Sequence, residues 1–360
     1  MGSRLFALTA TCAAEYSFHT NNDPADPPFL PPPPATVAVT FTNLMGITTN
    51  GATIPGFYGS GQAGDPNTGF VLTLPGNHFT PSNATFPGSS FIPVQTQMTA
   101  VNGNGTTFTG YTYPSNLGVA FDTQFGFYEQ GGVFHMVNNI QTPDCGTPGV
   151  CDPGVITENQ LIGVNNANLA VGFYNDIHGH SHGYTYNIPT GTFSPDILDP
   201  NAISTVTAAI NNSDEIVGFY TDTTPAAAIH GFIDEGGHFT TVDAPGSTET
   251  QLLGLNDNGI ADGFAVIGGV QHGILFNTLT DKFITILDPI GSTATTLNGI
   301  NDAGEVVGFF VDAAGNTDGV LGIPGVPEPG TWLMVLSGFA GLGWLRLRRA
   351  RRGEGAHALS

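Results

Sequence analysis

The chain has 360 residues, of which 7 are Lys or Arg and 29 are Asp or Glu, so its formal net charge is −22. Only 10% of the residues are charged, against about 25% in a typical soluble domain. With 50 glycines and 25 phenylalanines, this composition excludes a coiled coil and favours many short strands joined by tight turns. The shortage of basic residues argues against a nucleic-acid partner, because phosphate binding needs basic patches.

The first residues, Met1–Ala14, have the order of an export signal: Arg4, an apolar run over Leu5–Ala10, and then small residues. The apolar run has about the minimum length for a signal peptide. We therefore expect a weak or truncated signal, whose cleavage would remove Cys12; the alternative is an ordinary N-terminus. The proline-rich segment 23–34 favours polyproline II and is expected to be a spacer. Residues 1–34 are thus placed outside the folded body.

A repeated motif runs through the body of the chain. Its strongest copies include Ile210–Tyr220 and Ile300–Phe310, in which an Asn-Asx turn precedes a Val-Gly-aromatic strand. The glycine before the aromatic residue recurs at steps of 54, 62, 46, 45 and 45 residues, at Gly56, Gly110, Gly172, Gly218, Gly263 and Gly308. Such a period indicates a repeat architecture rather than a single irregular domain.

Each repeat predicts four short strands. In the fifth copy these are Gln251–Leu255, Ile260–Val266, Val270–Phe276 and Lys282–Leu287, separated by Asn-Gly, Gly-Gly and Asp-containing turns. Four strands in roughly 45 residues is the size of a propeller blade. We therefore predict an all-β fold with a six-bladed β-propeller over residues 35–323; a β-solenoid is the alternative.

The repeats resemble the HAF family of extracellular repeats, in which an Asn-Asp-x-Gly turn precedes a Val-Gly-Phe-Tyr strand and a His-Gly-Phe strand. The third element appears here as His182-Gly, His230-Gly and His272-Gly and changes to Asp318-Gly in the last copy. The resemblance covers residues 45–322. Its motifs are structural, so it implies an extracellular repeat body and assigns no catalytic residue.

Two clusters of side chains could carry chemistry. Three imidazoles that could meet a metal lie at His178, His180 and His182, because alternate residues of a strand share a face. We favour no functional metal site, since His182 belongs to the repeat itself and the other two are expected in a hairpin loop. Cys145 and Cys151 lie in an insertion within the longest step and could form a disulfide in an exported protein.

No catalytic motif is recognisable. The sequence lacks a Gly-x-Ser-x-Gly elbow, a His-Glu-x-x-His pair and a phosphate loop, and we expect no cofactor. The Asn-Asp-x-Gly turns are too short for EF-hand calcium loops, which place ligands across twelve positions. A pair of carboxylates gathered from separate blades stays possible, as in glycosidases.

The last repeat offers only three strands, Thr295–Asn301, Val306–Asp312 and Gly319–Ile323, before Pro324. A strand-like run at residues 35–42 precedes the first repeat. We therefore expect residues 35–42 to supply the missing strand and to close the ring, because an unpaired sheet edge there would invite aggregation.

The C-terminal segment 324–360 has a different composition from the body. Residues 329–345 carry no charge and are just long enough for a membrane helix. Five of the chain's seven basic residues follow this run, at Arg346, Arg348, Arg349, Arg351 and Arg352. The positive-inside rule places these arginines in the cytoplasm and the body outside. The alternative is a buried C-terminal helix.

The run begins at the last residue of the segment Val326, Pro327, Glu328 and Pro329. Pro-Glu-Pro followed by a short apolar helix and an arginine cluster resembles the PEP-CTERM sorting signal of Gram-negative bacteria, over residues 326–352. The resemblance implies processing by an exosortase-type membrane protease and an association with exopolysaccharide and biofilm.

Two functions follow from these patterns. The first is an exported, non-catalytic propeller that is held briefly in the inner membrane and then works in the periplasm, at the cell surface or in the extracellular matrix, with exopolysaccharide as a partner. The second is a carbohydrate-active propeller enzyme that uses carboxylates at the central channel.

Overall fold

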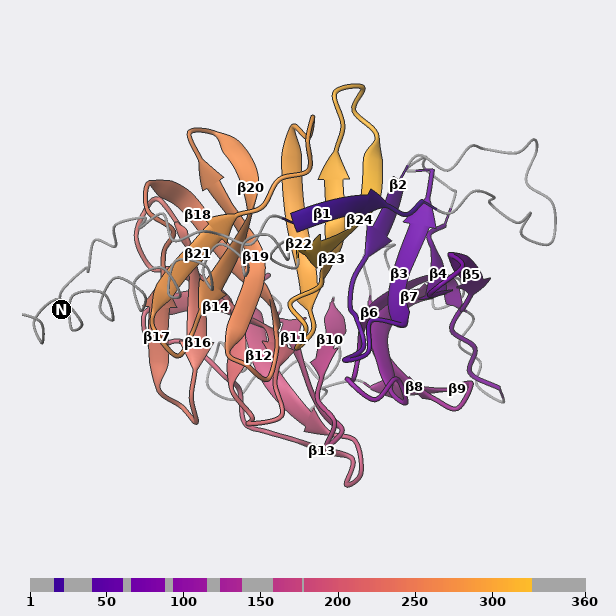
Figure 1. Cartoon of the computed structure of the whole chain (residues 1–360). Coiled ribbons are helices and arrows are strands. Elements are labelled where there is room, and N and C mark those ends of the chain that lie inside the picture. Colours follow the sequence, from indigo (N-terminus) through magenta and orange to yellow (C-terminus); the bar gives the residue numbers. More distant parts are fainter. Residues whose placement is uncertain are drawn as a thin grey trace, which may run out of the picture. The chain divides into compact units, whose positions relative to one another are not determined.

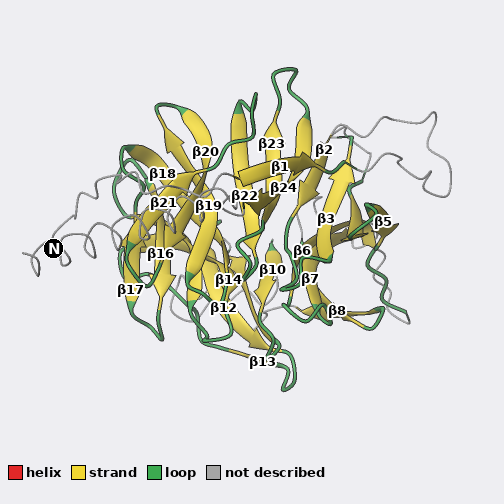
Figure 2. Ribbon diagram, viewed as in Figure 1, coloured by secondary structure: helices red, strands yellow, loops and turns green. Residues whose placement is uncertain are grey.

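The computed structural model describes residues 16–22, 41–60, 66–87, 93–114, 124–137, 158–176 and 178–325. Every regular element in these residues is a strand, and the strands number 24 (Figure 2). The described residues from Phe18 to Ile323 belong to one compact unit. The all-β class expected from the composition is therefore confirmed.

The strands form six antiparallel units of four, which we call blades and number in chain order. Blade 1 contains β2 (Phe41–Leu44), β3 (Thr53–Gly59), β4 (Thr68–Thr73) and β5 (His78–Pro81). Blade 2 contains β6 (Pro93–Val101), β7 (Phe108–Pro114), β8 (Phe125–Gln130) and β9 (Val133–Val137). Blade 3 contains β10 (Asn159–Val164), β11 (Leu169–Asn175), β12 (Ser181–Asn187) and β13 (Thr192–Phe193).

The remaining blades have the same order. Blade 4 contains β14 (Ala202–Ile210), β15 (Ile216–Asp222), β16 (Ile229–Asp234) and β17 (Phe239–Val242). Blade 5 contains β18 (Ser247–Leu255), β19 (Ile260–Ile267), β20 (Val270–Asn277) and β21 (Lys282–Ile286). Blade 6 contains β22 (Ala294–Ile300), β23 (Val306–Val311), β24 (Thr317–Pro324) and the N-terminal strand β1 (Tyr16–Thr20).

The blades follow one another around a common axis. The first strand of each of blades 2–6, and residues 45–47 and 49 just after β2 in blade 1, line one central cavity. Consecutive blades pack on each other, with blade 6 returning to blade 1. A parallel bridge between Phe41 and Thr317 joins β2 to β24, so that the indigo start and the yellow end of the described chain meet in Figure 1. The arrangement resembles β-propeller domains, and its antiparallel blades do not fit the solenoid alternative.

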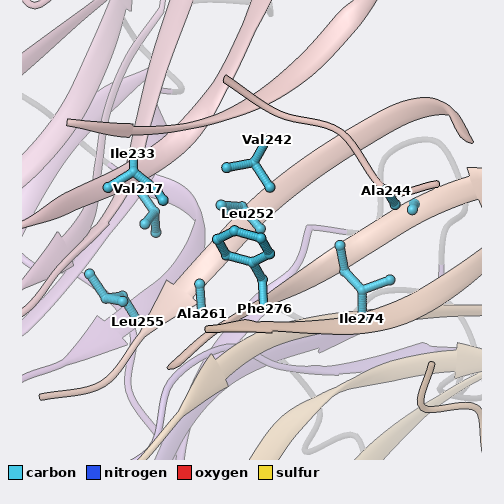
Figure 3. Packing of buried hydrophobic residues seen from close by; sticks show 10 residues of the cluster. Val217, Ile233, Val242, Ala244, Leu252, Leu255, Ala261, Ile274 and Phe276 are labelled. Atoms are coloured by element: carbon cyan, nitrogen blue, oxygen red, sulfur yellow. The ribbon is translucent and has the colours of Figure 1, made fainter. Parts of the chain in front are cut away.

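The cores lie within blades and between neighbouring blades. One cluster joins blades 4 and 5 (Figure 3): Val217 and Ile233 from blade 4 pack with Leu252, Ala261 and Phe276 from blade 5, all at most 5% exposed. Burying a side chain of this kind stabilises the fold by about 1.5–3 kcal/mol. Apolar residues on both faces of each blade therefore hold neighbouring blades together.

The glycine of the repeated motif is required by packing. A Cβ atom on Gly218 would overlap the carbonyl oxygen of Val206 on the adjacent inner strand and would lie 2.9 Å from the ring of Phe232. The same clash with the inner-strand carbonyl occurs at each of the other five copies, Gly56, Gly110, Gly172, Gly263 and Gly308. The inner-strand carbonyl therefore leaves no room for a side chain at this position, and the Phe232 ring comes from the next strand of the same blade.

The chain closes its ring with a strand other than the expected one. β1 pairs with β24 and completes blade 6, and the Asn21 backbone N–H donates to the Gly319 carbonyl at 2.9 Å. The prediction that residues 35–42 supply this strand is wrong: Phe41 and Thr42 begin β2, the innermost strand of blade 1. β1 lies within residues 1–34, which the sequence predicts to be a signal and spacer outside the folded body.

Candidate functional site

A cavity of about 140 Å³ lies on the axis, lined by the inner strands of blades 2–6 and by the residues just after β2 in blade 1. One layer of its wall is aliphatic, and each member is 5–9% exposed: Ile47, Val101, Val164, Ile210, Leu255 and Ile300. The residue after each of these is buried and polar, namely Thr48, Asn102, Asn165, Asn211, Asn256 and Asn301. The cavity therefore has an apolar wall that ends in a polar layer.

Small residues let the inner strands meet near the axis. The position before the aliphatic layer holds Gly46, Ala100, Gly163, Ala209, Gly254 and Gly299. A Cβ atom on Gly254 would lie 2.8 Å from the Cα atom of Gly299, and one on Gly299 would lie 3.1 Å from the Cα atom of Gly46. Neighbouring backbones thus touch directly, which leaves no room for larger side chains there.

Three of the buried asparagines, Asn165, Asn256 and Asn301, connect their blade to the next. The Asn256 side-chain oxygen accepts the backbone N–H groups of Asn258 at 3.0 Å and Ile260 at 2.9 Å within its own turn. Its amide nitrogen donates to the Asn301 carbonyl of the following blade at 2.9 Å. Asn165 and Asn301 repeat this arrangement toward Asn211 and Thr48. One side chain therefore serves as acceptor within a turn and donor between blades.

The next residue of each turn adds a second set of bonds. Asn166 donates its backbone N–H to the Asn212 side chain at 2.8 Å, Asn212 donates to Asp257 at 2.8 Å, and Asp257 donates to Asp302 at 2.9 Å. The circle continues from the Thr49 N–H to the Gly103 carbonyl at 3.1 Å and from Asn104 to Asn166 at 3.1 Å.

We call these two layers the axial clasp: Asn165, Asn166, Asn211, Asn212, Asn256, Asp257, Asn301 and Asp302. The interpretation of the turns as hairpins agrees with the structure. The hydrogen bonds between blades could not be predicted from one repeat, because their two partners lie in different repeats. The Oδ1 atoms of Asn256, Asp257 and Asp302 accept backbone N–H groups.

One buried carboxyl group lies close to the axis. Asp262 is fully buried and occupies the position that holds valine in blades 3, 4 and 6. Its carboxyl group packs against Gly254, and within the described part of the chain neither oxygen has a hydrogen-bond partner of good geometry. Burial raises the pKa of Asp262 to about 8, because an apolar site disfavours the charged form.

Histidine–aspartate pairs occur at the third strands. In blade 4 His230 Nδ1 lies 2.8 Å from Asp243 and Nε2 lies 3.6 Å from Asp222, while the ring stacks on Tyr220. In blade 5 His272 Nδ1 lies 2.6 Å from Asp288. These pairs tie the third strand to the residue that follows the fourth.

Blade 6 carries the same pair with other residues. Asp318 replaces the histidine, and the Asn22 amide donates to it at 2.6 Å. The Asn22 side-chain oxygen accepts the Gly319 N–H at 3.0 Å, as Asp288 accepts the Gly273 N–H in blade 5. Asn22 is therefore the equivalent of Asp288, supplied from the other end of the chain.

The histidine cluster of blade 3 is the most elaborate. Asp176 Oδ2 lies 3.3 Å from His182 Nε2 and 3.5 Å from His180 Nδ1, and Asp196 Oδ2 lies 3.3 Å from His182 Nδ1. Contact with Asp196 and then Asp176 raises the pKa of His182 against the opposing effect of burial. Burial alone would raise the pKa of Asp176, but the N–H groups of His180 and His178 outweigh it and lower that pKa. His180 and His182 thus share one carboxylate.

The remaining predicted site residues lie outside the described residues: Cys145 and Cys151, the sorting motif Val326, Pro327, Glu328 and Pro329, and the arginines Arg346, Arg348, Arg349, Arg351 and Arg352. Among the residues that the structure does describe, no helix has the length and apolar character needed to cross a membrane. The predicted membrane segment 329–345 is not among them.

No protein-family model matches the chain, and no curated protein matches it. Solved structures do. Trypanosoma rangeli sialidase in complex with the inhibitor DANA is 8% identical, covering 86% of this chain and 60% of that one, with a TM-score of 0.49. The β-propeller domain of the Trilobed protease from Pyrococcus furiosus is 10% identical over 75% and 79% of the two chains, with a TM-score of 0.41.

TolB from Acinetobacter baumannii is 11% identical, with a TM-score of 0.44. The match covers 67% of this chain and about half of the TolB chain, 52%. At such low identities these likenesses concern the fold alone.

Proposed function

We propose that the chain is an exported, non-catalytic six-bladed propeller that works at the cell surface or in the extracellular matrix, after sorting through a C-terminal membrane helix and Pro-Glu-Pro signal. The observation that carries the proposal is the axial clasp. Asp257 and Asp302, the carboxylates that line the axial cavity, each accept a backbone N–H from the preceding blade. Groups that hold blades together in this way are engaged in structure and are poorly placed for proton transfer.

Composition supports an extracellular role. Only Arg4 and Lys282 are basic before residue 346, against 28 acidic residues up to residue 345. Such an acidic body stays soluble by self-repulsion, and it meets polysaccharide through its polar turns. The proposed partners are exopolysaccharide, an exosortase-type protease and the inner membrane.

The test is incubation of the purified protein with exopolysaccharide fractions from biofilm-forming cells. We expect the protein to be retained on the polysaccharide without release of reducing ends. Reducing ends that appear with the wild type and disappear with D257N or D302N would overturn the proposal in favour of a carbohydrate-active enzyme.

A further inference from the structure

Blades 3 and 4 share a frame of four side chains on the same strands. An aspartate follows the second strand or ends it, a histidine lies on the third strand, a second aspartate follows the fourth strand, and a tyrosine stacks on the histidine. In blade 3 these are Asp176, His182, Asp196 and Tyr174, and in blade 4 they are Asp222, His230, Asp243 and Tyr220. Blade 3 differs by two further histidines in the loop, His178 and His180.

The distances in blade 3 match those between the ligands of a metal ion. Two ligand atoms each about 2.0–2.1 Å from a tetrahedral zinc ion are about 3.3–3.4 Å apart. Asp176 Oδ2 lies 3.3 Å from His182 Nε2 and 3.5 Å from His180 Nδ1. One carboxylate oxygen and two imidazole nitrogens therefore already have two of the separations that such a site requires.

The surrounding bonds hold the two inner ligands in place. Asp176 is 8% exposed, and its Oδ1 accepts the N–H groups of His178 and His180, both at 2.8 Å, so that Oδ2 faces the imidazoles. Asp196 lies behind His182 and accepts the Tyr174 hydroxyl at 2.9 Å. A carboxylate behind a histidine fixes the ring and strengthens it as a ligand.

The third ligand is the most exposed one. As the side chains are placed, no group of three His, Cys, Asp or Glu among the described residues could hold a metal ion, so a site here requires one side chain to turn. His180, whose side chain is 45% exposed, can turn toward His182 without disturbing buried neighbours. We propose that blade 3 binds a zinc-like divalent transition metal ion through Asp176 Oδ2, His182 Nε2 and His180, with water in the fourth position.

The ligand set selects among metals. Imidazole nitrogen suits zinc, copper and nickel, whereas calcium and magnesium prefer sites made of oxygen. Blade 4 has no counterpart of His180, because residues 223–228 of its loop are Thr, Thr, Pro and three alanines. Blade 4 therefore serves as a control, because it keeps the four side chains of the frame and lacks the third metal ligand. The blade 3 site does not depend on the proposed surface function.

The test is titration of the untagged full-length chain, stripped with EDTA, with Zn²⁺ in competition with a chromophoric chelator. We expect one tightly bound zinc ion per chain. H180N should lower the affinity at least tenfold and leave the metal-free melting temperature unchanged, because His180 is exposed. H230N, which removes the blade 4 histidine that corresponds to His182, should leave the affinity unchanged.

A second readout separates a built site from adventitious binding. Co²⁺ bound to the wild type should give the visible absorption of a tetrahedral site, and H180N should abolish it. Zinc that binds H180N as tightly as the wild type, or an equal loss of affinity in H230N, would mean adventitious binding only and would overturn the proposal.

Discussion

At the scale of single residues, asparagine and aspartate at related positions do different work because of what surrounds them. Asparagine carries both an acceptor and a donor on one side chain, and the clasp uses both. Asp257 and Asp302 need only accept, so a carboxylate suffices at the exposed rim. Asp262 has no such role and stands where the repeat has valine. The sequence showed the repeated Asn but not its second bond, since the bonded residue lies 45 or 46 positions away.

The clasp predicts a strong effect of N256D. The substitution keeps the acceptor oxygen, removes the donor to the Asn301 carbonyl and places a charge at a position only 5% exposed. Leaving a buried group unpaired and burying a charge should lower the free energy of unfolding by about 2–4 kcal/mol. The control is N258D, which adds the same charge at an exposed position of the same turn and removes only a solvent-exposed hydrogen bond, from the Asn258 amide to the Asp302 carbonyl. Urea unfolding should show a change below about 1 kcal/mol for the control; equal effects would contradict the clasp.

Asp262 predicts a pH-dependent stability. Its pKa is raised from 3.8 to about 8 in the folded protein, so the unfolded chain releases this proton first as the pH rises. The contribution of Asp262 to stability should therefore fall between about pH 4 and pH 8 and stay low above that range. D262V, which restores the residue of the other blades, should gain stability over the wild type at pH 8 by on the order of a few kcal/mol.

The measurement for D262V is the free energy of unfolding at pH 4.5 and at pH 8. The difference in the free energy of unfolding between variant and wild type should widen with pH. Taking this difference cancels the contributions of all other titrating groups. A difference that does not change with pH would show that Asp262 is ionised in the fold.

At the scale of elements, the strands within a repeat were predictable because turn residues and alternating apolar residues recur in every copy. In the fifth copy Val270–Phe276 was expected and β20 spans Val270–Asn277. β1 was missed because an outer strand needs little apolar surface, and its residues are half-buried or exposed. A signal was available, since Asn22-Asp-Pro24 has the spacing of Asp243-Ala-Pro245 after the fourth strand of blade 4.

This equivalence predicts a charge swap in blade 6. N22D should place a second carboxylate beside Asp318 and remove the donor that now bonds it, which should lower the free energy of unfolding by about 1–2 kcal/mol. The double variant N22D/D318H recreates the Asp288–His272 pair of blade 5 and should recover most of the loss near pH 6. Additive losses in the double-mutant cycle would show that β1 does not complete blade 6 as described.

At the scale of the whole molecule, the body and the tail have opposite charge. In the body, aspartate side chains pair with histidine or asparagine, where many proteins pair aspartate with lysine or arginine. The basic residues are therefore concentrated at the end of the chain. The fold could be anticipated because it is repeated. The function could not be anticipated in this way. The repeated residues are those that pack and connect the blades, whereas a ligand site needs only one blade to differ, as blade 3 does.

The charge asymmetry predicts how the tail acts. Replacing Arg346, Arg348, Arg349, Arg351 and Arg352 with glutamine removes five of the seven basic residues and leaves the apolar run before them intact. Because basic residues beside a membrane helix set its orientation, the variant should be less well retained in the inner membrane and less completely processed at Pro327-Glu328-Pro329. Membrane fractionation and the size of the mature chain measure both effects. The matched control replaces the same residues with lysine, which keeps the charge and should behave as the wild type; a glutamine variant that is retained and processed normally would refute the sorting role.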